Sequence, residues 1–238
     1  MISVIVPAYK EAETIEGTIR KLLKILRDHK ISFEIIVIVD EVPNDKTADI
    51  VGSLTKEYKE IRSLIRKGKK GVGKALRDGI KMSHGNVIIP IMADSSENPM
   101  DVIRLSQKVE DGYEIAVGNR FIRKSALMKY PLSKYIANRG YYCLVKVFFS
   151  FPSNDVTNAF KAYNAEILKN LTLESDGFEI FAEIPLKAYL SGYTKVVNVP
   201  VSYYDRKEGA PKLILMTEGR KYLRMLGKLV RYRLTHDK

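Results

Sequence analysis

Acidic residues follow strand-like apolar segments at three places in the first half of this 238-residue sequence. They are Glu11, Asp40, Glu41 and Asp94. Because the carboxyl ends of parallel strands share one edge of a sheet, these side chains are expected to meet in one crevice, where open α/β sheets bind ligands. Carboxylates gathered there either ligate a divalent cation beside a phosphate or accept hydrogen bonds from a base and a ribose. The alternative is that each acid caps the helix after its strand.

The stretch 87–99 carries the strongest of these signals. A nearly continuous apolar run, typical of a strand buried on both faces, stops at Asp94 and is followed by small polar residues. A helix is then expected from Pro99 to about Val109. Asp94 would therefore lie at the mouth of the crevice.

Strands alternate with helices along the first half of the chain. Besides the run before Asp94, strands are expected at 2–7, 33–39, 61–65 and 114–118, and helices at 14–30, 47–58, 74–82 and 99–109. This alternation predicts βαβ units and a mostly parallel sheet. Later in the chain we expect helices at 133–149, 179–191 and 213–234 and strands at 159–164 and 196–203.

The chain is strongly basic. It has 40 Lys and Arg against 28 Asp and Glu, a net charge of +12, which indicates an anionic partner: a nucleic acid, a phospholipid or a phosphorylated substrate. A single cysteine suits a reducing compartment. No apolar run approaches the roughly 18 to 20 residues that span a bilayer. The expected location is the cytoplasm, peripherally on the cytoplasmic face of a membrane.

Basic and apolar residues are mixed in two later segments. Residues 121–154 contain six Lys or Arg and no acid, and residues 206–238 contain ten Lys or Arg against three acids. The helical parts of both segments also carry Tyr, Phe, Leu and Val, a mixture that fits a membrane interface. For 133–149 an ordinary core helix with a solvated basic face explains the pattern equally well.

Short motifs follow one another in a fixed order along almost the whole chain. In the first half they are Val4-Ile5-Val6-Pro7-Ala8-Tyr9-Lys10-Glu11, Val39-Asp40-Glu41 with Asp45 and Thr47, Gly71-Val72-Gly73-Lys74-Ala75, and Met92-Ala93-Asp94. In the second half they are Val117–Arg120, Ser133-Lys134 with Asn138, Asp155–Tyr163, Glu179–Glu183, and Tyr204–Gly209 with Lys212. The first set resembles inverting family-2 glycosyltransferases with a GT-A fold, and the second resembles their dolichyl-phosphate mannose synthase branch.

The resemblance implies a fold and a division of the chain. The fold is α/β, a GT-A (Rossmann-like) sheet, mostly parallel and flanked by helices, with a C-terminal amphipathic helix. Residues 1–205 would form the catalytic domain, with a nucleotide-sugar-binding half at 1–118 and an acceptor-binding half at 119–205. Residues 206–238 would form a basic C-terminal segment.

The resemblance also implies roles for individual residues. Pro7, Tyr9, Glu11 and Asp40 would hold the base and ribose of the nucleotide, with Lys74 in a Gly/Lys loop near the donor. Asp94 would bind the diphosphate through Mg²⁺ or Mn²⁺. Arg120, Lys134 and Arg206 would bind phosphates of the donor or the lipid acceptor.

The implied reaction moves a hexose from a nucleotide sugar, GDP-mannose or a UDP-hexose, to a polyprenyl or dolichyl phosphate. Such a phosphate is already anionic near neutral pH, since its second pKa is about 6, so it needs no general base. Some relatives carry transmembrane helices beyond the point where this sequence stops. A small membrane-anchoring partner is therefore a further expectation, and nucleic acid is not an expected partner.

One motif departs from the family pattern. Where the family usually has Asp-x-Asp, this chain has Met92-Ala93-Asp94. A thioether is a poor ligand for a hard cation, which prefers oxygen. Either Asp94 acts together with Ser96, Glu97 or substrate oxygens, or the dependence on metal is weaker.

Three other functions compete with this one. Gly68–Lys74 has the spacing of a phosphate-binding P-loop, but Ala75 stands where Ser or Thr would hold Mg²⁺. The charge and the tyrosines would also suit a non-enzymatic nucleic-acid-binding protein, although acids at the strand ends would repel phosphate. A third alternative keeps the transferase and gives it a sugar hydroxyl as acceptor, with a carboxylate as base: Asp176, Glu179 or Glu183.

Overall fold

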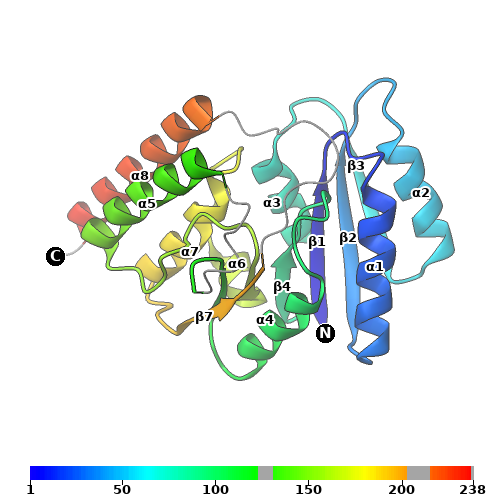
Figure 1. Ribbon diagram of the computed structural model, residues 1–238, viewed down its shortest axis with the longest axis horizontal. Coiled ribbons are helices and arrows are strands. Elements are labelled where there is room, and N and C mark those ends of the chain that lie inside the picture. The colour runs from blue at the N-terminus through cyan, green and yellow to red at the C-terminus, as the bar shows by residue number, and fades with distance from the viewer. Residues whose placement is uncertain (123–130, 203–214, 237–238) are drawn as a thin grey trace.

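The computed structural model describes residues 1–122, 131–202 and 215–236, which form one seven-stranded sheet covered by helices on both faces (Figure 1). The strands are β1 (Ile2–Ala8), β2 (Phe33–Asp40), β3 (Ile61–Arg66), β4 (Val87–Pro90), β5 (Ile115–Asn119), β6 (Lys161–Asn164) and β7 (Val196–Pro200). The helices are α1 (Ile15–Asp28), α2 (Thr47–Glu57), α3 (Val72–Met82), α4 (Met100–Glu110), α5 (Leu132–Phe149), α6 (Ala165–Asn170), α7 (Ile180–Leu190) and α8 (Leu215–His236). The predicted α/β class and C-terminal helix are confirmed.

The strand order is β3-β2-β1-β4-β6-β5-β7. Strands β1 to β4 are parallel to their neighbours in this group, and Ala8, Val39 and Ile65 stand side by side in the register. The carboxyl ends of β1, β2 and β3 therefore share one edge, as the alternation of strands and helices predicted. Strand β6 runs antiparallel to both β4 and β5. The sequence pattern of so short a strand contains no signal for its direction.

Successive side chains along each central strand point to opposite faces of the sheet, so the hydrophobic core has two layers. Val4 and Val6 of β1 pack with α1, α2 and α4, while Ile5 packs with α3 and the later helices. This is the period of two that a strand imposes on its side chains. A strand buried on both faces needs apolar residues at every position, which explains the continuous apolar runs in the first half of the sequence.

The observed elements differ from expectation in several places. Strand β4 ends at Pro90, although the apolar run continues to Met92, and strand β7 ends at Pro200, short of the predicted 203. In both cases the strand stops at a proline, which has no N–H to donate to a sheet. The short helix α6 was not predicted. Its first turn is capped by Asn164, whose side chain accepts a hydrogen bond from the Glu166 amide at 2.9 Å.

Helix α7 contains a proline, and a buried lysine compensates for it. Pro185 cannot donate the usual helical hydrogen bond to the carbonyl of Phe181, four residues earlier. The Nζ of Lys161 donates to this carbonyl at 3.0 Å and also to the carbonyl of Asn158. Burial lowers the pKa of Lys161 to about 7, opposed by the nearby Asp155. Lys161 thus ties β6 to the first turn of α7.

This arrangement predicts a coupling between Lys161 and Pro185. Replacing Lys161 by Met leaves the Phe181 carbonyl without a donor, whereas Pro185→Ala restores the helical N–H that can take its place. We expect Lys161→Met to lower the free energy of unfolding more in the wild-type protein than in the Pro185→Ala variant, by about 1 kcal/mol. Urea unfolding of the two single variants and the double variant measures the difference, and additive effects would contradict the compensation.

Candidate active site

The first two parallel strands end at one pocket. Pro7, Tyr9, Glu11 and Asp40 all line it, in a cavity of about 410 Å³ that also includes the loop 176–179 and part of α8. These are the four residues that the sequence assigned to the base and ribose of a nucleotide. The structure brings them together, as the shared sheet edge requires.

Glu11 links the pocket to α1. Its side chain is 7% exposed, and Oε2 accepts a hydrogen bond from the hydroxyl of Thr14 at 3.0 Å. Its backbone N–H donates to the hydroxyl of Thr47, at the start of α2, at 2.9 Å. Glu11 therefore lines the pocket and does not cap α1 with its carboxylate, since the amides of Thr14 and Ile15 donate to its backbone carbonyl instead.

Asp40 holds the Gly/Lys loop against the pocket. Its carboxylate accepts hydrogen bonds from Arg66 Nη1 at 2.7 Å and from the Gly71 amide at 2.8 Å. Lys70, next to Gly71, lines the pocket, and its Nζ lies 5.2 Å from the centroid of the Tyr9 ring. Lys70 is a candidate donor-binding residue that the sequence interpretation missed, because that interpretation took Lys74 from the same loop.

The Gly/Lys loop does not form the cradle of a P-loop. The Gly71 amide donates to Asp40 and the Gly73 amide donates to the carbonyl of Asp176 at 2.9 Å, so both N–H groups already have protein partners. Lys74 lies 3.3 Å from the Asp176 carboxylate and is not among the described residues that line the pocket. This geometry weighs against the NTPase alternative.

Asp94 lies in a turn directly beyond the pocket wall. Its carboxylate accepts a hydrogen bond from the Ser96 amide at 3.1 Å, and Met92, two residues earlier, lines the pocket. Glu97 accepts hydrogen bonds from the Met92 amide at 3.1 Å and the Ser96 hydroxyl at 3.3 Å. Desolvation, and then the neighbouring Asp94, raise the pKa of Glu97 to about 8. Ionised carboxylates at both positions would repel one another, so Glu97 keeps its proton near neutral pH when no cation is bound.

Such a pair suits a hard divalent cation, which prefers oxygen ligands. Within the described residues no group of three or more His, Cys, Asp or Glu is arranged to hold a metal ion. A cation between Asp94 and Glu97 would therefore need further oxygens, from Ser96, water or the diphosphate of a bound nucleotide. The missing first Asp of the usual motif is consistent with a metal shared between protein and substrate.

Arg120 is anchored beside this pair. Its guanidinium makes two hydrogen bonds, of 2.9 and 2.7 Å, to the fully buried carboxylate of Asp155. Its charge also opposes the rise in the pKa of Glu97. The ion pair fixes the guanidinium in place, which a flexible arginine at the surface would not achieve.

Of the other two predicted phosphate ligands, the structure describes only Lys134. Lys134 lies in the first turn of α5, half-buried, and is not among the described residues that line the pocket. Arg206 lies outside the described residues. The expectation that Lys134 and Arg206 bind phosphate remains a prediction.

The loop 174–179 forms the other wall of the pocket. Glu183 of α7 accepts hydrogen bonds from the amides of Glu174 and Ser175, at 2.9 and 2.8 Å, and pairs with Lys187 at 2.8 Å. Burial alone would raise the pKa of Glu183, but these hydrogen bonds outweigh it and the pKa is lowered. Glu183 is therefore a support for the loop rather than a base.

Asp176 is similarly engaged. Its carboxylate pairs with Arg77 and with Lys74, and these contacts lower its pKa against the raising effect of burial. Of the three carboxylates considered as a base for a hydroxyl acceptor, only Glu179 is without an ion pair in the described part of the chain. One of its oxygens is buried and has no hydrogen-bond partner in residues 1–122, 131–202 and 215–236.

Comparison with known proteins identifies the family. Residues 3–172 match the model of glycosyl transferase family 2, and the chain belongs to this family. Its relatives include proteins that make lipid-linked mannose. A dolichol-phosphate mannosyltransferase of Pyrococcus furiosus is 27% identical over 97% of this chain, which spans 64% of that protein. A polyprenol monophosphomannose synthase of Mycolicibacterium smegmatis is 24% identical over 88% of this chain and 80% of that protein. The resemblance seen in the sequence is confirmed.

Solved structures show the same fold. Glucosyl-3-phosphoglycerate synthase from Mycobacterium tuberculosis with uridine diphosphate gives a TM-score of 0.73 at 17% identity, covering 97% of this chain and 80% of that chain. Its complex with Mn²⁺, uridine diphosphate and glucosyl-3-phosphoglycerate gives 0.70 at 18% identity, over 97% of this chain and 80% of that one. At this identity the likeness shows the GT-A fold alone. Because the chain belongs to a glycosyltransferase family, the enzyme is favoured over the alternative of a non-enzymatic nucleic-acid-binding protein.

Gly73 of α3 packs so closely against the loop 174–179 that a side chain would not fit there. A Cβ at Gly73 would stand 2.2 Å from the Ser175 carbonyl oxygen, whereas a Cβ at Gly52 in α2 would have nothing within 4 Å. Gly73→Ala must displace the loop and should lower the free energy of unfolding by about 1 to 3 kcal/mol. Gly52→Ala, the matched control, should raise it by about 0.5 to 1 kcal/mol, the usual gain in a helix. Thermal and urea unfolding compare the two, and equal effects would contradict the packing argument.

Proposed function

We propose that this protein is an inverting glycosyltransferase that moves a hexose from a nucleotide sugar to a polyprenyl phosphate at a membrane surface. Mannose from GDP-mannose and dolichyl phosphate form the leading pair of substrates, by similarity to the lipid-mannose synthases. The observation that carries the proposal is the continuity of the site: the pocket of Pro7 and Asp40 adjoins, through Met92, the pair Asp94 and Glu97, beside Arg120.

The donor fits this arrangement in one orientation. The nucleoside would lie against Tyr9, Glu11 and Asp40, and the diphosphate would extend toward Asp94. Lys70 and Arg120 bring positive charge to the two ends of that path. Mg²⁺ or Mn²⁺ held by Asp94, Ser96 and Glu97 would neutralise the diphosphate as it leaves.

The acceptor requires little activation. A phosphate oxygen of the lipid attacks C1 of the hexose from the face opposite the nucleotide, and the bond between C1 and the diphosphate oxygen breaks with its electrons on the diphosphate. The phosphate monoester is already anionic, with a second pKa of about 6. What the protein must contribute is positive charge around the phosphates and stabilisation of the leaving diphosphate.

Ligand binding tests the donor and the metal together. We expect the matching sugar among GDP-, UDP- and CDP-sugars to raise the melting temperature, with a further rise on adding Mn²⁺. In Asp94→Asn the rise due to Mn²⁺ should disappear and transfer should be abolished, whereas Asp111→Asn on the surface should behave as wild type. Thermal shift and product formation measure both, and near-wild-type turnover in Asp94→Asn would remove Asp94 from the mechanism.

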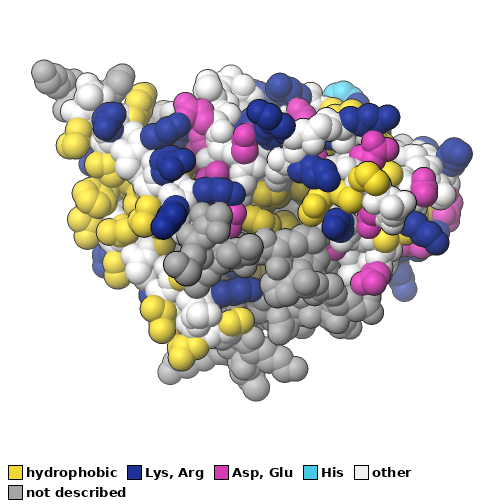
Figure 2. Space-filling model, turned by 90° about the horizontal axis from the view of Figure 1, so that it is seen from above, with side chains coloured by type: hydrophobic (Ala, Val, Ile, Leu, Met, Phe, Trp, Pro, Cys, Tyr) yellow, Lys and Arg dark blue, Asp and Glu magenta, His cyan; other side chains and the backbone are white. Residues whose placement is uncertain are grey.

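Helices α5 and α8 form the surface proposed to meet the membrane. They lie side by side, and their C-terminal ends are joined by a hydrogen bond from Arg233 to the Phe148 carbonyl (Figure 1). Exposed apolar side chains on them are Leu132, Ile136, Leu144, Val147, Phe148, Leu223 and Leu234. Hydrophobic side chains gather at this end of the molecule, with Lys and Arg beside them (Figure 2). Within the described residues no helix is long and apolar enough to cross a bilayer.

This surface can be tested with vesicles. Val147 is 75% exposed and Leu223 is 54% exposed, so Val147→Asp and Leu223→Asp should not disturb the core. Each adds a negative charge where anionic lipid is expected, and each should weaken binding to vesicles containing an acidic phospholipid by about tenfold. Met100→Asp, on the first turn of α4, is the matched control. Unchanged sedimentation with vesicles in both variants would refute a membrane role for α5 and α8.

A sugar-hydroxyl acceptor is the second candidate, and it is favoured by one observation. Glu179 has a buried carboxylate oxygen to which no described residue donates a hydrogen bond, as a general base would need before its substrate binds. Polyprenyl phosphate and a free sugar with unprotected hydroxyl groups can be offered with the same donor. Glycosylation of the second compound alone would establish the alternative.

A further inference from the structure

Two glutamates meet at Gly177 in the wall of the donor pocket. Glu179 is 7% exposed; its Oε1 accepts a weak hydrogen bond from the Gly177 amide at 3.3 Å, and its Oε2 has no partner among the described residues. Glu218 of α8 accepts a hydrogen bond from Lys221 at 2.7 Å through Oε1, and its buried Oε2 likewise has none. Both Oε2 atoms are thus withdrawn from water without a hydrogen-bond donor among the described residues, although the Glu218 carboxylate is ion-paired with Lys221 through its other oxygen.

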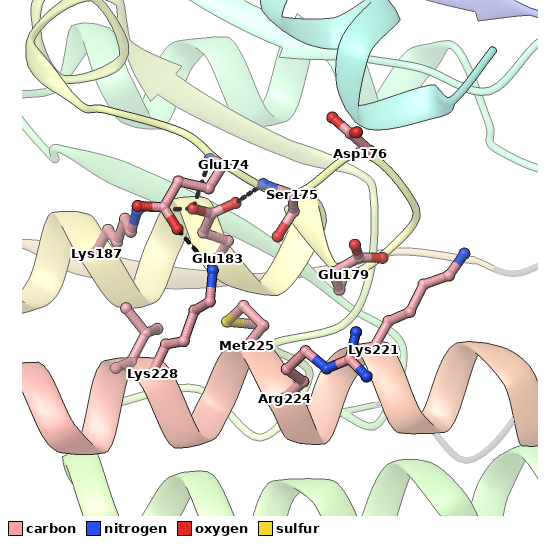
Figure 3. A pocket seen from close by; sticks show the side chains of 11 residues that line it. Glu174, Ser175, Asp176, Glu179, Glu183, Lys187, Lys221, Arg224, Met225 and Lys228 are labelled. Atoms are coloured by element: carbon pink, nitrogen blue, oxygen red, sulfur yellow. Dashed lines mark hydrogen bonds and ion pairs between the residues drawn. The ribbon is translucent and has the colours of Figure 1, made fainter. Parts of the chain in front are cut away.

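The two oxygens lie close together. A Cβ at Gly177 would stand 2.6 Å from Oε2 of Glu179 and 3.3 Å from both Oε2 of Glu218 and Nζ of Lys221. Glu179, Glu218 and Lys221 line the same pocket as Tyr9 and Asp40. Figure 3 shows Glu179 and Lys221 reaching from the start of α7 and from α8 into the space below Asp176.

Helix α8 is held in place over this loop. The hydroxyl of Tyr222 donates to the Phe178 carbonyl at 2.8 Å, and its ring packs edge-on against Tyr141 of α5, with centroids 5.3 Å apart. Glu218 and Lys221 lie about one turn or less from Tyr222 on the same helix. Their positions at the pocket are therefore fixed by packing.

An uncompensated buried carboxylate oxygen costs about 1 to 3 kcal/mol or more, so two of them at one place indicate a ligand that donates hydrogen bonds. The charges around them limit its chemistry. Two carboxylates repel a phosphate, and the Lys221 ammonium disfavours a divalent cation. A neutral ligand with several hydroxyl groups satisfies both conditions, because each hydroxyl can donate to a carboxylate and accept from Lys221.

We propose that Glu179, Glu218 and Lys221 bind the hydroxyl groups of the transferred hexose and so determine which sugar the enzyme accepts. The inference rests on the proposed function and adds the part of the donor site that recognises the sugar. The base and ribose would remain with Tyr9, Glu11 and Asp40. Glu179 is then a positioning residue for the hexose in the reaction with a lipid phosphate.

Isothermal titration of the full-length protein with GDP-mannose and with GDP, both in the presence of Mn²⁺, tests the proposal. Glu179→Gln and Glu218→Gln keep the size of the side chain and remove its charge. We expect each substitution to weaken the affinity for GDP-mannose by about tenfold, the difference between a charged and a neutral hydrogen bond. The affinity for GDP should not change. Glu174→Gln is the matched control, since Glu174 lies on the same loop and does not line the donor pocket.

The melting temperature without ligand gives a second readout. Glu179→Gln removes a buried charge that has no ion pair in the described part of the chain, so its melting temperature should equal or exceed that of wild type, as is usual when a residue serves binding rather than stability. Glu218→Gln also gives up the ion pair with Lys221, so its melting temperature should fall slightly. A lower melting temperature for Glu179→Gln together with unchanged GDP-mannose binding would assign Glu179 a structural role and overturn the proposal.

The other outcomes separate this inference from the function on which it rests. If the variants lose affinity for GDP and for GDP-mannose equally, the nucleotide binds at this cluster. If they lose affinity for Mn²⁺, the cluster is a metal site. Either result overturns the hexose assignment. If wild type binds the nucleotide sugar and both variants bind it equally well, only this inference fails. If wild type binds no nucleotide sugar at all, the proposed function and the inference fail together.

Discussion

The close contact between α3 and the loop 174–179 is the constraint on which the site depends. Gly73 donates its amide to the Asp176 carbonyl, and neither Gly71 nor Gly73 has room for a side chain there. Asp40 fixes Gly71 from one side, and Glu183 fixes Ser175 from the other. The early part of the chain and its later part are therefore joined by backbone contacts at the pocket itself. Any side chain that separated them would open the donor site.

Buried polar groups in the second half of the chain serve the same end. Lys161 completes the hydrogen bonding of α7 at Pro185, and Asp155 holds the guanidinium of Arg120. Since such groups are destabilising unless paired, they fix one arrangement of the elements around them. In this fold they fix the start of α7, which carries Glu179, and the arginine beside Asp94 and Glu97.

The distribution of paired and unpaired carboxylates separates support from function. Asp40, Asp155, Asp176 and Glu183 all have cationic partners and hold loops or helices in place. Glu179 and Glu218 each keep one buried oxygen without a hydrogen-bond partner among the described residues, although Glu218 pairs with Lys221 through the other, and ionised Asp94 and Glu97 would repel one another. These four groups lie around the donor pocket and the turn beside it. This is the pattern expected where a substrate and a metal ion complete the hydrogen bonding.

The sequence by itself determined the α/β class, the parallel first half and the gathering of Glu11 and Asp40, because apolar periodicity and strand ends are local signals. Pro7 and Tyr9 were placed beside them by the resemblance to the family. It also contained the family motifs. The tertiary structure decided what the sequence could not: the antiparallel direction of β6, Lys70 rather than Lys74 at the pocket, and the meeting of Glu179 with Glu218. Those features depend on contacts between segments far apart in the chain, and which of two nearby lysines or glutamates finds a partner is settled only when the segments pack.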